Sequence, residues 1–399
     1  MNKQIDLIFR TALGDRRLVA NETDSIVDVC RKYGIPTTQI TTYLRDRQGD
    51  LNLVVQPWRP IAEYAKGADV VVFPNRNIDY ERLLGGADVV RERTGASTWV
   101  RFREDDPQSG GRFVTELLRP DQAQDIVAAQ VKEALQLASV EDQPLVVGVS
   151  GGGDSNALLG AIVKSGIVSK ANIIPVMMLG IPDWDKGAER AAAICAEYGV
   201  PLRFVAERDT ARILGFADPT SDWVSAFEKS FPDDDLEILG VYGVRKVLEF
   251  VAAEVRSPSI VIGTNLEDCL ADVLYFLSAG KIPFPRPRGK LKEVDLLCPL
   301  WLTPKAVIDG CYPKFSRENY EARYASRMSG RAYFYYLAQM IIDAYPDAGQ
   351  VLLRGASKLS KEMFQELPYD EEFQTTTMSV IPLDIRLKLR KLFGLKLTG

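Results

Sequence analysis

The middle of the chain alternates apolar runs with amphipathic stretches. Four apolar runs are typical of buried strands: residues 144–150, 173–179, 201–205 and 259–265. Helical patterns separate them, over residues 157–166, 186–198 and 241–255. Apolar strands separated by helices predict an α/β fold, a parallel sheet with helices on both faces. Because ligands of such sheets lie at the carboxyl ends of the strands, the residues that follow each run are the first candidates for a site.

The first part of the chain has a different pattern, and we interpret residues 1–83 as a separate domain. Two strands flank a turn at Gly14-Asp15, and a short helix capped by Asp24 or Ser25 ends at Gly34. The strands are expected over residues 5–10, 16–20, 40–46, 51–55 and 69–75. This order resembles the β-grasp domains of the ubiquitin and sulfur-carrier type.

The rest of the chain divides into three parts. Sulfur carriers of the β-grasp type end in Gly-Gly, but here Gly85-Gly86 is followed by more chain, so there is no free carboxylate to activate. We interpret residues 84–118 as a connector because they are polar and rich in turn signals. Residues 119–310 form the α/β domain, and residues 311–399 a helical C-terminal region with a basic tail.

The composition removes several kinds of chemistry. The 399 residues include no histidine, which excludes Ser-His-Asp and Cys-His relays and HExxH zinc proteases. The cysteines are scattered and odd in number, so we expect neither a disulfide framework nor a zinc site: Cys30, Cys195, Cys269, Cys298 and Cys311. No apolar run resembles a signal peptide or a membrane span, so we expect a cytoplasmic protein without membrane contact. A net charge of −5 disfavours a nucleic-acid partner without excluding it.

One motif carries chemistry. Ser150-Gly151-Gly152-Gly153-Asp154-Ser155 stands where the strand 144–150 gives way to a helix. Consecutive glycines let backbone N–H groups approach an anion closely, and the helix N-terminus adds unpaired amides. A carboxylate beside a polyphosphate is repulsive unless a cation lies between them, so Asp154 predicts Mg²⁺. A glycine-rich turn that is merely capped by Asp and Ser is the alternative.

The segment VGVSGGGDSNALL resembles the PP-loop, SGGxDS, of N-type ATP pyrophosphatases. Later segments are similar to the branch that contains tRNA lysidine synthetase and the tRNA 2-thiolation enzymes: residues 242–246, 259–274 and 298–300. The resemblance covers roughly residues 140–350 and implies an adenine nucleotide α-hydrolase-like fold. In that superfamily the loop grips the β- and γ-phosphates of ATP while a substrate oxygen attacks the α-phosphorus.

The resemblance also implies roles for particular residues. Asp154, Asp268 and Lys246 would be catalytic, with Asp154 as a Mg²⁺ ligand and Asp268 as a candidate second ligand. The nucleotide would be held by Ser150, Gly151, Gly152, Gly153, Ser155, Met178, Leu179, Gly263, Thr264 and Asn265. Glu267 beside Asp268 has the alternative reading of helix N-terminal charge. For Arg245 and Lys246 the alternative is a solvated helix face.

Two departures from the branch matter. Thr264 stands where the branch usually has histidine, and no C-x-x-C precedes Arg245-Lys246. These departures disfavour an Fe–S cluster. Cys269 is the best candidate for a persulfide carrier, against the alternative of an ordinary buried thiol.

The sequence therefore predicts an AMP-forming enzyme that uses ATP to adenylate a carbonyl oxygen, for displacement by sulfur or nitrogen. The acceptor is a tRNA base or a related small molecule, and a sulfur-carrier or other protein partner and a homodimer stay open. Two basic segments, 280–292 and 384–397, are candidates to contact RNA, to close over ATP or simply to pack. The competing hypothesis is an ATP-binding sensor or scaffold whose N-terminal domain docks a protein.

Overall fold

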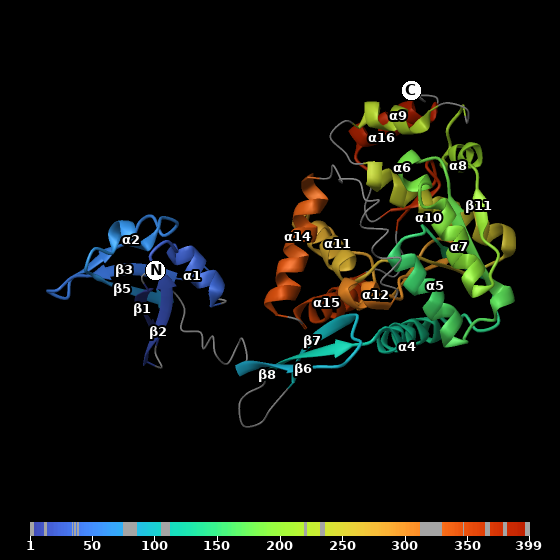
Figure 1. The fold of residues 1–399 in the computed structure, drawn as a ribbon. Coiled ribbons are helices and arrows are strands. Elements are labelled where there is room, and N and C mark those ends of the chain that lie inside the picture. The colour runs from blue at the N-terminus through green and yellow to red at the C-terminus, as the bar shows by residue number, and fades with distance from the viewer. Residues whose placement is uncertain are drawn as a thin grey trace. The chain divides into compact units, whose positions relative to one another are not determined.

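A computed structural model shows the fold (Figure 1). It describes residues 4–11, 14–33, 35, 37, 40–74, 86–104, 112–218, 222–231, 236–311, 329–345, 347–363, 368–377 and 381–395. The expected stop at Gly34 and the turns within 105–111 lie outside these residues. The chain divides into two compact units, one of residues 1–89 and 103–114, the other of residues 90–102 and 115–399.

The first unit contains a five-stranded sheet in the order β2-β1-β5-β3-β4. The strands are β1 (Gln4–Thr11), β2 (Gly14–Asn21), β3 (Ile40–Arg45), β4 (Leu51–Leu53) and β5 (Asp69–Pro74). β1 pairs antiparallel with β2 and parallel with β5, which is the arrangement expected of a β-grasp-like domain. The hairpin differs in detail, because Gly14 belongs to β2 and is already paired with Thr11 of β1.

Helix α1 (Ile26–Lys32) closes the core of this first sheet. Ser25 and Asp28 cap it reciprocally, since the Ser25 hydroxyl accepts from the Asp28 N–H at 3.1 Å and Asp28 accepts from the Ser25 N–H at 3.0 Å. A short helix, α2 (Ile61–Tyr64), adds Ile61 to the same apolar cluster. The sequence identified Ser25 as one of the two candidate caps.

The expected connector contains strands. β6 (Gly86–Arg91), β7 (Thr98–Glu104) and β8 (Arg112–Leu118) form a three-stranded sheet in the order β6-β8-β7. Charged residues and turn signals interrupt the apolar stretches of this segment, although Phe113, Val114 and Leu118 of β8 are buried. The segment that the sequence predicted as a connector thus contains a small sheet, which the sequence analysis did not predict.

The second unit is built on a six-stranded sheet in the order β11-β10-β9-β12-β14-β13. The strands are β9 (Leu145–Gly148), β10 (Ile173–Met178), β11 (Arg203–Val205), β12 (Ser259–Val261), β13 (Arg288–Lys290) and β14 (Asp295–Leu297). All the pairs are parallel except β13–β14. The predicted parallel α/β sheet is confirmed.

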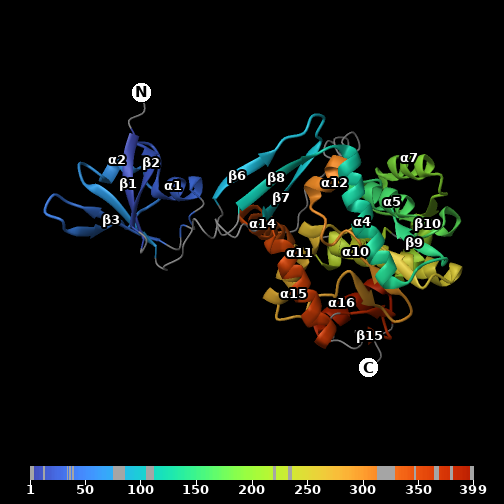
Figure 2. The ribbon, with the colours of Figure 1, turned by 90° about the horizontal axis from the view of Figure 1, so that it is seen from below.

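Helices cover both faces of this sheet (Figures 1 and 2). Along β9, Leu145 and Val147 join one apolar cluster while Val146 joins the other, because successive side chains point to opposite faces. The first cluster packs under α4 (Pro120–Ala138), α5 (Gly153–Ser165), α7 (Ala188–Tyr198) and α12 (Lys305–Cys311). The second packs under α8 (Glu207–Leu214), α9 (Trp223–Ser230), α10 (Leu236–Val255) and α16 (Leu383–Phe393).

The C-terminal region is mainly helical, as expected, with one small hairpin. α11 (Leu266–Ser278) shares an apolar cluster with α14 (Ser329–Ala344) and α15 (Ala348–Met363). β15 (Tyr369–Asp370) and β16 (Thr375–Thr376) pair antiparallel before α16. Two short elements complete the described part, a 3₁₀ helix (Lys170–Asn172) and α6 (Pro182–Asp185). No helix among the described residues is long and apolar enough to cross a membrane.

Candidate functional site

The order of the strands places a ligand site between β9 and β12. From β9 the chain moves outward through β10 to β11, and it then returns to the other side of β9 as β12. The segments that follow β9 and β12 thus leave neighbouring parallel strands in different directions. Open α/β sheets bind ligands at such a switch point, outside the carboxyl ends of the strands. The SGGGDS loop and residues 263–265 both lie there.

The loop is held in a tight conformation by its own serines. The Ser155 hydroxyl donates to the Gly152 carbonyl at 3.0 Å and accepts from the Ser150 N–H at 3.2 Å. The Ser150 and Ser155 hydroxyl oxygens are 3.3 Å apart. Gly151 has φ +75°, a conformation that favours glycine. These contacts confirm the turn but occupy part of the serines' hydrogen-bonding capacity.

The N-terminus of α7 packs backbone to backbone against this loop. A Cβ on Gly151 would lie 2.3 Å from the Gly187 carbonyl oxygen, and a Cβ on Gly187 would lie 2.3 Å from the Ser150 carbonyl oxygen. Arg190 Nε donates to the Gly151 carbonyl at 3.2 Å. Glycine is therefore required on both sides of the contact. The sequence analysis missed Gly187 and Arg190, which no motif marked.

Helix α5 begins inside the loop. Its N-cap is Gly152, which offers no side chain to cap the first turn. Helix N–H groups at this end have no partner within the helix, and the helix dipole favours negative charge there. The first turn is thus a suitable place for an anion such as a phosphate group.

A cluster of charged and polar side chains surrounds Asp154. Lys305 Nζ lies 2.8 Å from Asp154 Oδ1, and Asn265 Nδ2 donates to Asp154 Oδ2 at 3.1 Å. Lys305 Nζ also donates to Asp309 Oδ1, one turn further along α12. The side chains are largely buried, with exposed fractions of 27% for Asp154 and 14% for Lys305. The structure thus brings two predicted residues, Asp154 and Asn265, together with two that the sequence analysis missed.

The neighbouring carboxylates stabilise the positive charge of Lys305. Burial alone would lower the pKa of Lys305, but Asp154 and Asp309 outweigh burial and raise it above the ordinary lysine value. The lysine follows the Cys298-Pro299-Leu300 segment that the sequence analysis singled out, and its spacing of four residues from Asp309 was the available signal.

Glu267 and Asp268 have structural partners. Both Glu267 carboxylate oxygens accept from the Lys305 backbone N–H, at 3.1 and 2.9 Å, and burial raises the pKa of Glu267. Asp268 forms a capping box at the start of α11, where its N–H donates to Asn265 Oδ1 at 2.9 Å. Glu267 thus anchors α12, and Asp268 helps to fix the Asn265 side chain that reaches Asp154.

The remaining predicted nucleotide contacts lie around the same edge. A Cβ on Gly263 would lie 3.4 Å from the Asp154 carbonyl, so the backbone of Gly263 packs closely against the loop. Met178 is nearly buried, and its sulfur would lie 3.3 Å from a Cβ on Gly243 of α10. The Leu179 N–H donates to the Val205 carbonyl at 3.0 Å, which extends the β10–β11 pairing to the end of β10.

Lys246 and Arg245 lie against the C-terminal hairpin. Lys246 Nζ donates to the backbone carbonyls of Phe373 and Gln374, at 3.3 and 2.8 Å. Arg245 Nη2 donates to the Thr376 carbonyl at 3.0 Å. These bonds tie α10 to the turn between β15 and β16, and the structure does not bring Lys246 together with the loop residues.

Thr264 belongs to a buried cluster with a guanidinium. Arg286 Nη1 donates to Thr264 Oγ1 at 3.1 Å and also to the Cys298 sulfur, and Arg286 Nη2 pairs with Asp272 at 3.1 Å. Cys269 lies beside Thr264, and burial raises the pKa of its thiol to about 12. The thiol form therefore dominates near neutral pH, which favours the alternative of an ordinary buried thiol over a persulfide carrier.

Most of the described cations in the two basic segments have internal partners. Arg288 and Lys290 both pair with Asp295, and Lys292 pairs with Glu371. In α16, Arg386 contacts Asp370 and Glu372, and Arg390 contacts Glu372. These pairs favour the packing interpretation of both segments over an open RNA-binding surface.

Comparison with known proteins finds similarity at the level of structure. No family model matches the chain, and no curated protein matches its sequence. A U34-tRNA thiolase, NcsA, from Methanococcus maripaludis is 18% identical with a TM-score of 0.47, over 62% of this chain and 82% of that one. An NH3-dependent NAD synthetase from Campylobacter jejuni is 14% identical with a TM-score of 0.35, over 63% and 99%. An NMN synthetase from Francisella tularensis is 11% identical with a TM-score of 0.33, over 71% and 98%.

One expectation is corrected by this comparison. The missing C-x-x-C disfavoured an Fe–S cluster, but the similar thiolase holds a [4Fe–4S] cluster, so that exclusion is wrong. Its physical basis was too narrow, because a local spacing in the sequence says little about ligands that the fold brings together. Within the described residues, no group of three or more His, Cys, Asp or Glu side chains is arranged to hold a metal ion.

The fold assignment rests on the chain's own features. The sheet order, the crossing at β9 and β12 and the SGGGDS loop at the start of α5 agree with the fold that the loop's resemblance implied. The second unit is accordingly a parallel α/β domain of the adenine nucleotide α-hydrolase-like kind, with the loop at its switch point.

Proposed function

We propose that the chain is an ATP-dependent, AMP-forming enzyme that activates a carbonyl oxygen of its acceptor. The observation that carries this proposal is the position of the SGGGDS loop, which combines a glycine-requiring turn, a helix N-terminus and a switch point in one place. Each feature alone is common, but together they describe a binding site for a polyphosphate.

The phosphates of ATP would meet a positive environment at this loop. Backbone N–H groups of the first turn of α5 and the hydroxyls of Ser150 and Ser155 would donate to the β- and γ-phosphates. Lys305 Nζ lies 2.8 Å from Asp154 Oδ1, and it would also pair with the incoming phosphates. Phosphoryl chemistry needs mainly positioning and charge neutralisation, which suits a chain without histidine.

The residues around Asp154 fit a cation. Two carboxylates, Asp154 and Asp309, share one cation position, and the Lys305 ammonium fills it. Mg²⁺ favours one or two carboxylates together with substrate phosphates, which is the donor set that Asp154, Asp309 and ATP would provide. Bound there, Mg²⁺ would supply neutralisation of the polyphosphate charge. Asp268 is less suited because it already caps α11.

The proposed reaction has two steps. A carbonyl oxygen of the acceptor attacks the α-phosphorus of ATP, and the bond to the β-phosphate oxygen breaks with release of pyrophosphate. A sulfur or nitrogen nucleophile then attacks the activated carbon, and AMP leaves with the former carbonyl oxygen. We propose a tRNA base or a related small molecule as acceptor, because residues 242–246, 259–274 and 298–300 resemble the lysidine and thiolation branch.

The test uses the full chain with Mg²⁺ and ATP, total tRNA, and sulfide or ammonium as donor. AMP and pyrophosphate should appear only in the complete mixture, and nucleoside mass spectrometry of the tRNA should show the modified base. Asp154→Asn should reduce AMP release by at least about 100-fold, whereas Asp384→Asn, at an exposed position of α16, serves as the matched control. Tight ATP binding without AMP in every acceptor mixture would instead favour a sensor or scaffold.

A further inference from the structure

Helix α15 exposes an apolar stripe at the outside of the second unit (Figure 2). Four large apolar side chains of this helix are 45–64% exposed: Val351, Leu352, Leu359 and Met363. Positions 351, 355, 359 and 363 are four residues apart, so they lie on one side of the helix. A single exposed leucine needs no explanation, but a contiguous apolar patch marks a surface that binds a partner.

The other face of α15 is already packed against the chain. Leu353 is buried in the apolar cluster that α15 shares with α11 and α14. Ser357 Oγ accepts from the Arg286 N–H at 3.1 Å, and Ser360 Oγ donates to the Pro283 carbonyl at 2.7 Å. These contacts fix the rotation of the helix about its axis, so the apolar stripe is a permanent part of the surface.

Gly355 lies in the middle of the stripe. A glycine inside a helix lowers its stability relative to alanine. A Cβ on Gly355 would have no atom within 4 Å outside its own helical turn, so no contact in the described chain requires a glycine there. Between Val351 and Leu359 it leaves a gap in the ridge of side chains, where the backbone of a second helix can approach closely.

Charged residues differ between the two ends of the stripe. Asp343 and Asp347 lie at the amino end of α15, whereas Lys358 and Lys361 lie towards its carboxyl end. The pair between Lys358 and Glu362 is 3.9 Å long with both side chains exposed, so it holds Lys358 only weakly. The surface is therefore acidic at one end of the apolar stripe and basic at the other.

A second copy of α15 matches this surface when it runs antiparallel. With the two Gly355 residues opposite each other, Val351 of each copy meets Leu359 of the other. The acidic end of each helix then lies beside the basic end of its partner, and the two helix dipoles are antiparallel, which is the favourable arrangement. A parallel copy would instead place like charges side by side.

We infer that two copies of this chain associate through α15 as a twofold-symmetric, antiparallel helix pair. Such a contact uses the same patch on both copies, as closed dimers do. The helix of 16 residues is about 24 Å long, so the contact is at the small end of protein interfaces and a dissociation constant in the micromolar range is expected. The inference is independent of the proposed ATP chemistry, because no residue of the SGGGDS loop belongs to α15.

Sedimentation velocity of the full chain between about 1 and 100 μM tests the association. The mass should rise with concentration from 44.4 kDa towards twice that value. Gly355→Gln and Leu359→Lys should each raise the dissociation constant at least tenfold. The new side chain at position 355 meets no other part of the chain, so thermal unfolding monitored by circular dichroism should show that this variant keeps its fold. Leu383→Lys, at a 70% exposed leucine of α16, is the matched control and should associate normally.

Cross-linking with a short bis-maleimide tests the orientation. Gly355→Cys should cross-link to itself, and Val351→Cys should cross-link to Leu359→Cys when the two variants are mixed. Val351→Cys alone should not, because antiparallel pairing separates the two positions by about 12 Å along the helix axis. The five native cysteines are buried, so the wild type should not cross-link.

Three results would overturn the inference. A chain that stays monomeric up to about 100 μM, as expected if residues 1–89 or a different protein cover the stripe, would exclude a second copy as the partner. A dimer that Gly355→Gln and Leu359→Lys both leave unchanged would place the contact elsewhere. Cross-linking of Val351→Cys to itself would show a parallel pair.

Discussion

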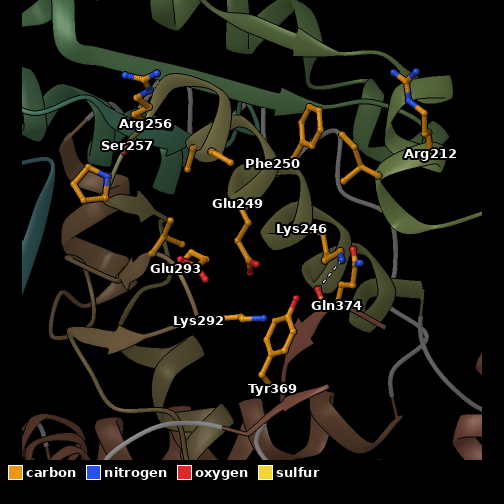
Figure 3. A pocket seen from close by; sticks show the side chains of 15 residues that line it. Arg212, Lys246, Glu249, Phe250, Arg256, Ser257, Lys292, Glu293, Tyr369 and Gln374 are labelled. Carbon is orange, nitrogen blue, oxygen red and sulfur yellow. Dashed lines mark hydrogen bonds between the residues drawn. The ribbon is translucent and has the colours of Figure 1, made fainter. Parts of the chain in front are cut away.

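The carboxyl ends and the amino ends of the parallel strands, called here the carboxyl edge and the amino edge of the sheet, differ in how their charged side chains are paired. At the carboxyl edge, Asp154 has both oxygens engaged, by Lys305 and Asn265, and the backbone of the loop touches that of α7. At the amino edge, Glu249 lines a pocket of about 850 Å³ (Figure 3) and pairs through Oε1 with Arg245 Nε at 3.2 Å. A preorganised, crowded edge suits chemistry on a fixed group, whereas an open pocket lined by charged and apolar side chains suits binding of a ligand.

Two lysines illustrate this difference. Lys246 and Lys305 are both largely buried, and sequence resemblance favoured Lys246 as the catalytic one. Lys246 donates to main-chain carbonyls of the β15–β16 turn, and burial lowers its pKa. Lys305 instead meets two carboxylates beside the loop, which raise its pKa. The position of a charge relative to its partners, rather than the residue type, distinguishes the two edges.

The largest effect is expected when the cation of the carboxyl edge is removed. Lys305→Met leaves Asp154 and Asp309 as neighbouring, partly buried carboxylates without their ammonium, which should cost about 3 kcal/mol of unfolding free energy. Urea unfolding measures it. Lys164→Met is the matched control, because its pair with Asp125 is exposed and should contribute no more than about 0.5 kcal/mol. Equal losses in the two variants would contradict the special role of Lys305.

The close backbone contact between the loop and the start of α7 can be tested by adding one methyl group at Gly151. Gly151→Ala places a Cβ 2.3 Å from the Gly187 carbonyl oxygen, so the loop must shift and ATP affinity should fall roughly 100-fold, or ~2.7 kcal/mol. Gly166→Ala controls for backbone strain alone, since Gly166 has φ +66° with no atom within 4 Å of the added Cβ. ATP titrations of both variants measure the difference. Normal ATP binding by Gly151→Ala would show that the loop does not bind ATP.

The basic tail should behave as a packing element rather than as part of either edge. Arg386 contacts Asp370 and Glu372, so Arg386→Gln should lower the unfolding free energy by about 1 kcal/mol and leave ATP affinity unchanged. Differential scanning calorimetry and ATP titration provide the two readouts. A loss of ATP or RNA binding without a loss of stability would show that the tail contacts a ligand instead.

The smallest effect concerns the pH dependence of Glu249. Burial raises the pKa of Glu249 above its ordinary value of 4.5, despite the opposing charges of Arg245 and Lys246. The native state therefore holds this proton more tightly than the unfolded state, so ionisation of Glu249 lowers stability as pH rises above 4.5. Glu249→Gln should be slightly more stable relative to the wild type at pH 7.5 than at pH 4.5. Thermal unfolding at both pH values, with Glu254→Gln as control, checks the sign.

The sequence predicted the strands and the loop that form the site, but not most of the side-chain contacts within it. Period-two and continuous apolar runs located β9, β10, β11 and β12, and the SGGGDS motif located the loop, because these signals are local. Lys305 and Asp309 lie about 150 residues from Asp154, and only the return of β14 to the side of β12 brings α12 to the loop. The strands within residues 84–118 were missed for another reason, because charged residues and turn signals interrupt short apolar stretches such as Phe113-Val114.

The role of Asp268 shows the limit of transferring a motif. The Asn265–Asp268 spacing that resembled a catalytic segment is also that of a capping box, and the structure uses it to cap α11. The two readings are compatible in sequence because both need a side-chain acceptor at the start of a helix. The contact of Asn265 with Asp154 links the cap to the site.

The central proposal, cleavage of ATP between its α- and β-phosphates at the loop, is tested most directly by the fate of a labelled α-phosphate. The full chain would be incubated with Mg²⁺, a sulfide or ammonium donor, total tRNA and ATP labelled at the α-phosphorus, and the products separated by anion-exchange chromatography. The label should appear in AMP, in amounts equal to the pyrophosphate released. Label in ADP, accompanied by orthophosphate, would contradict the proposal.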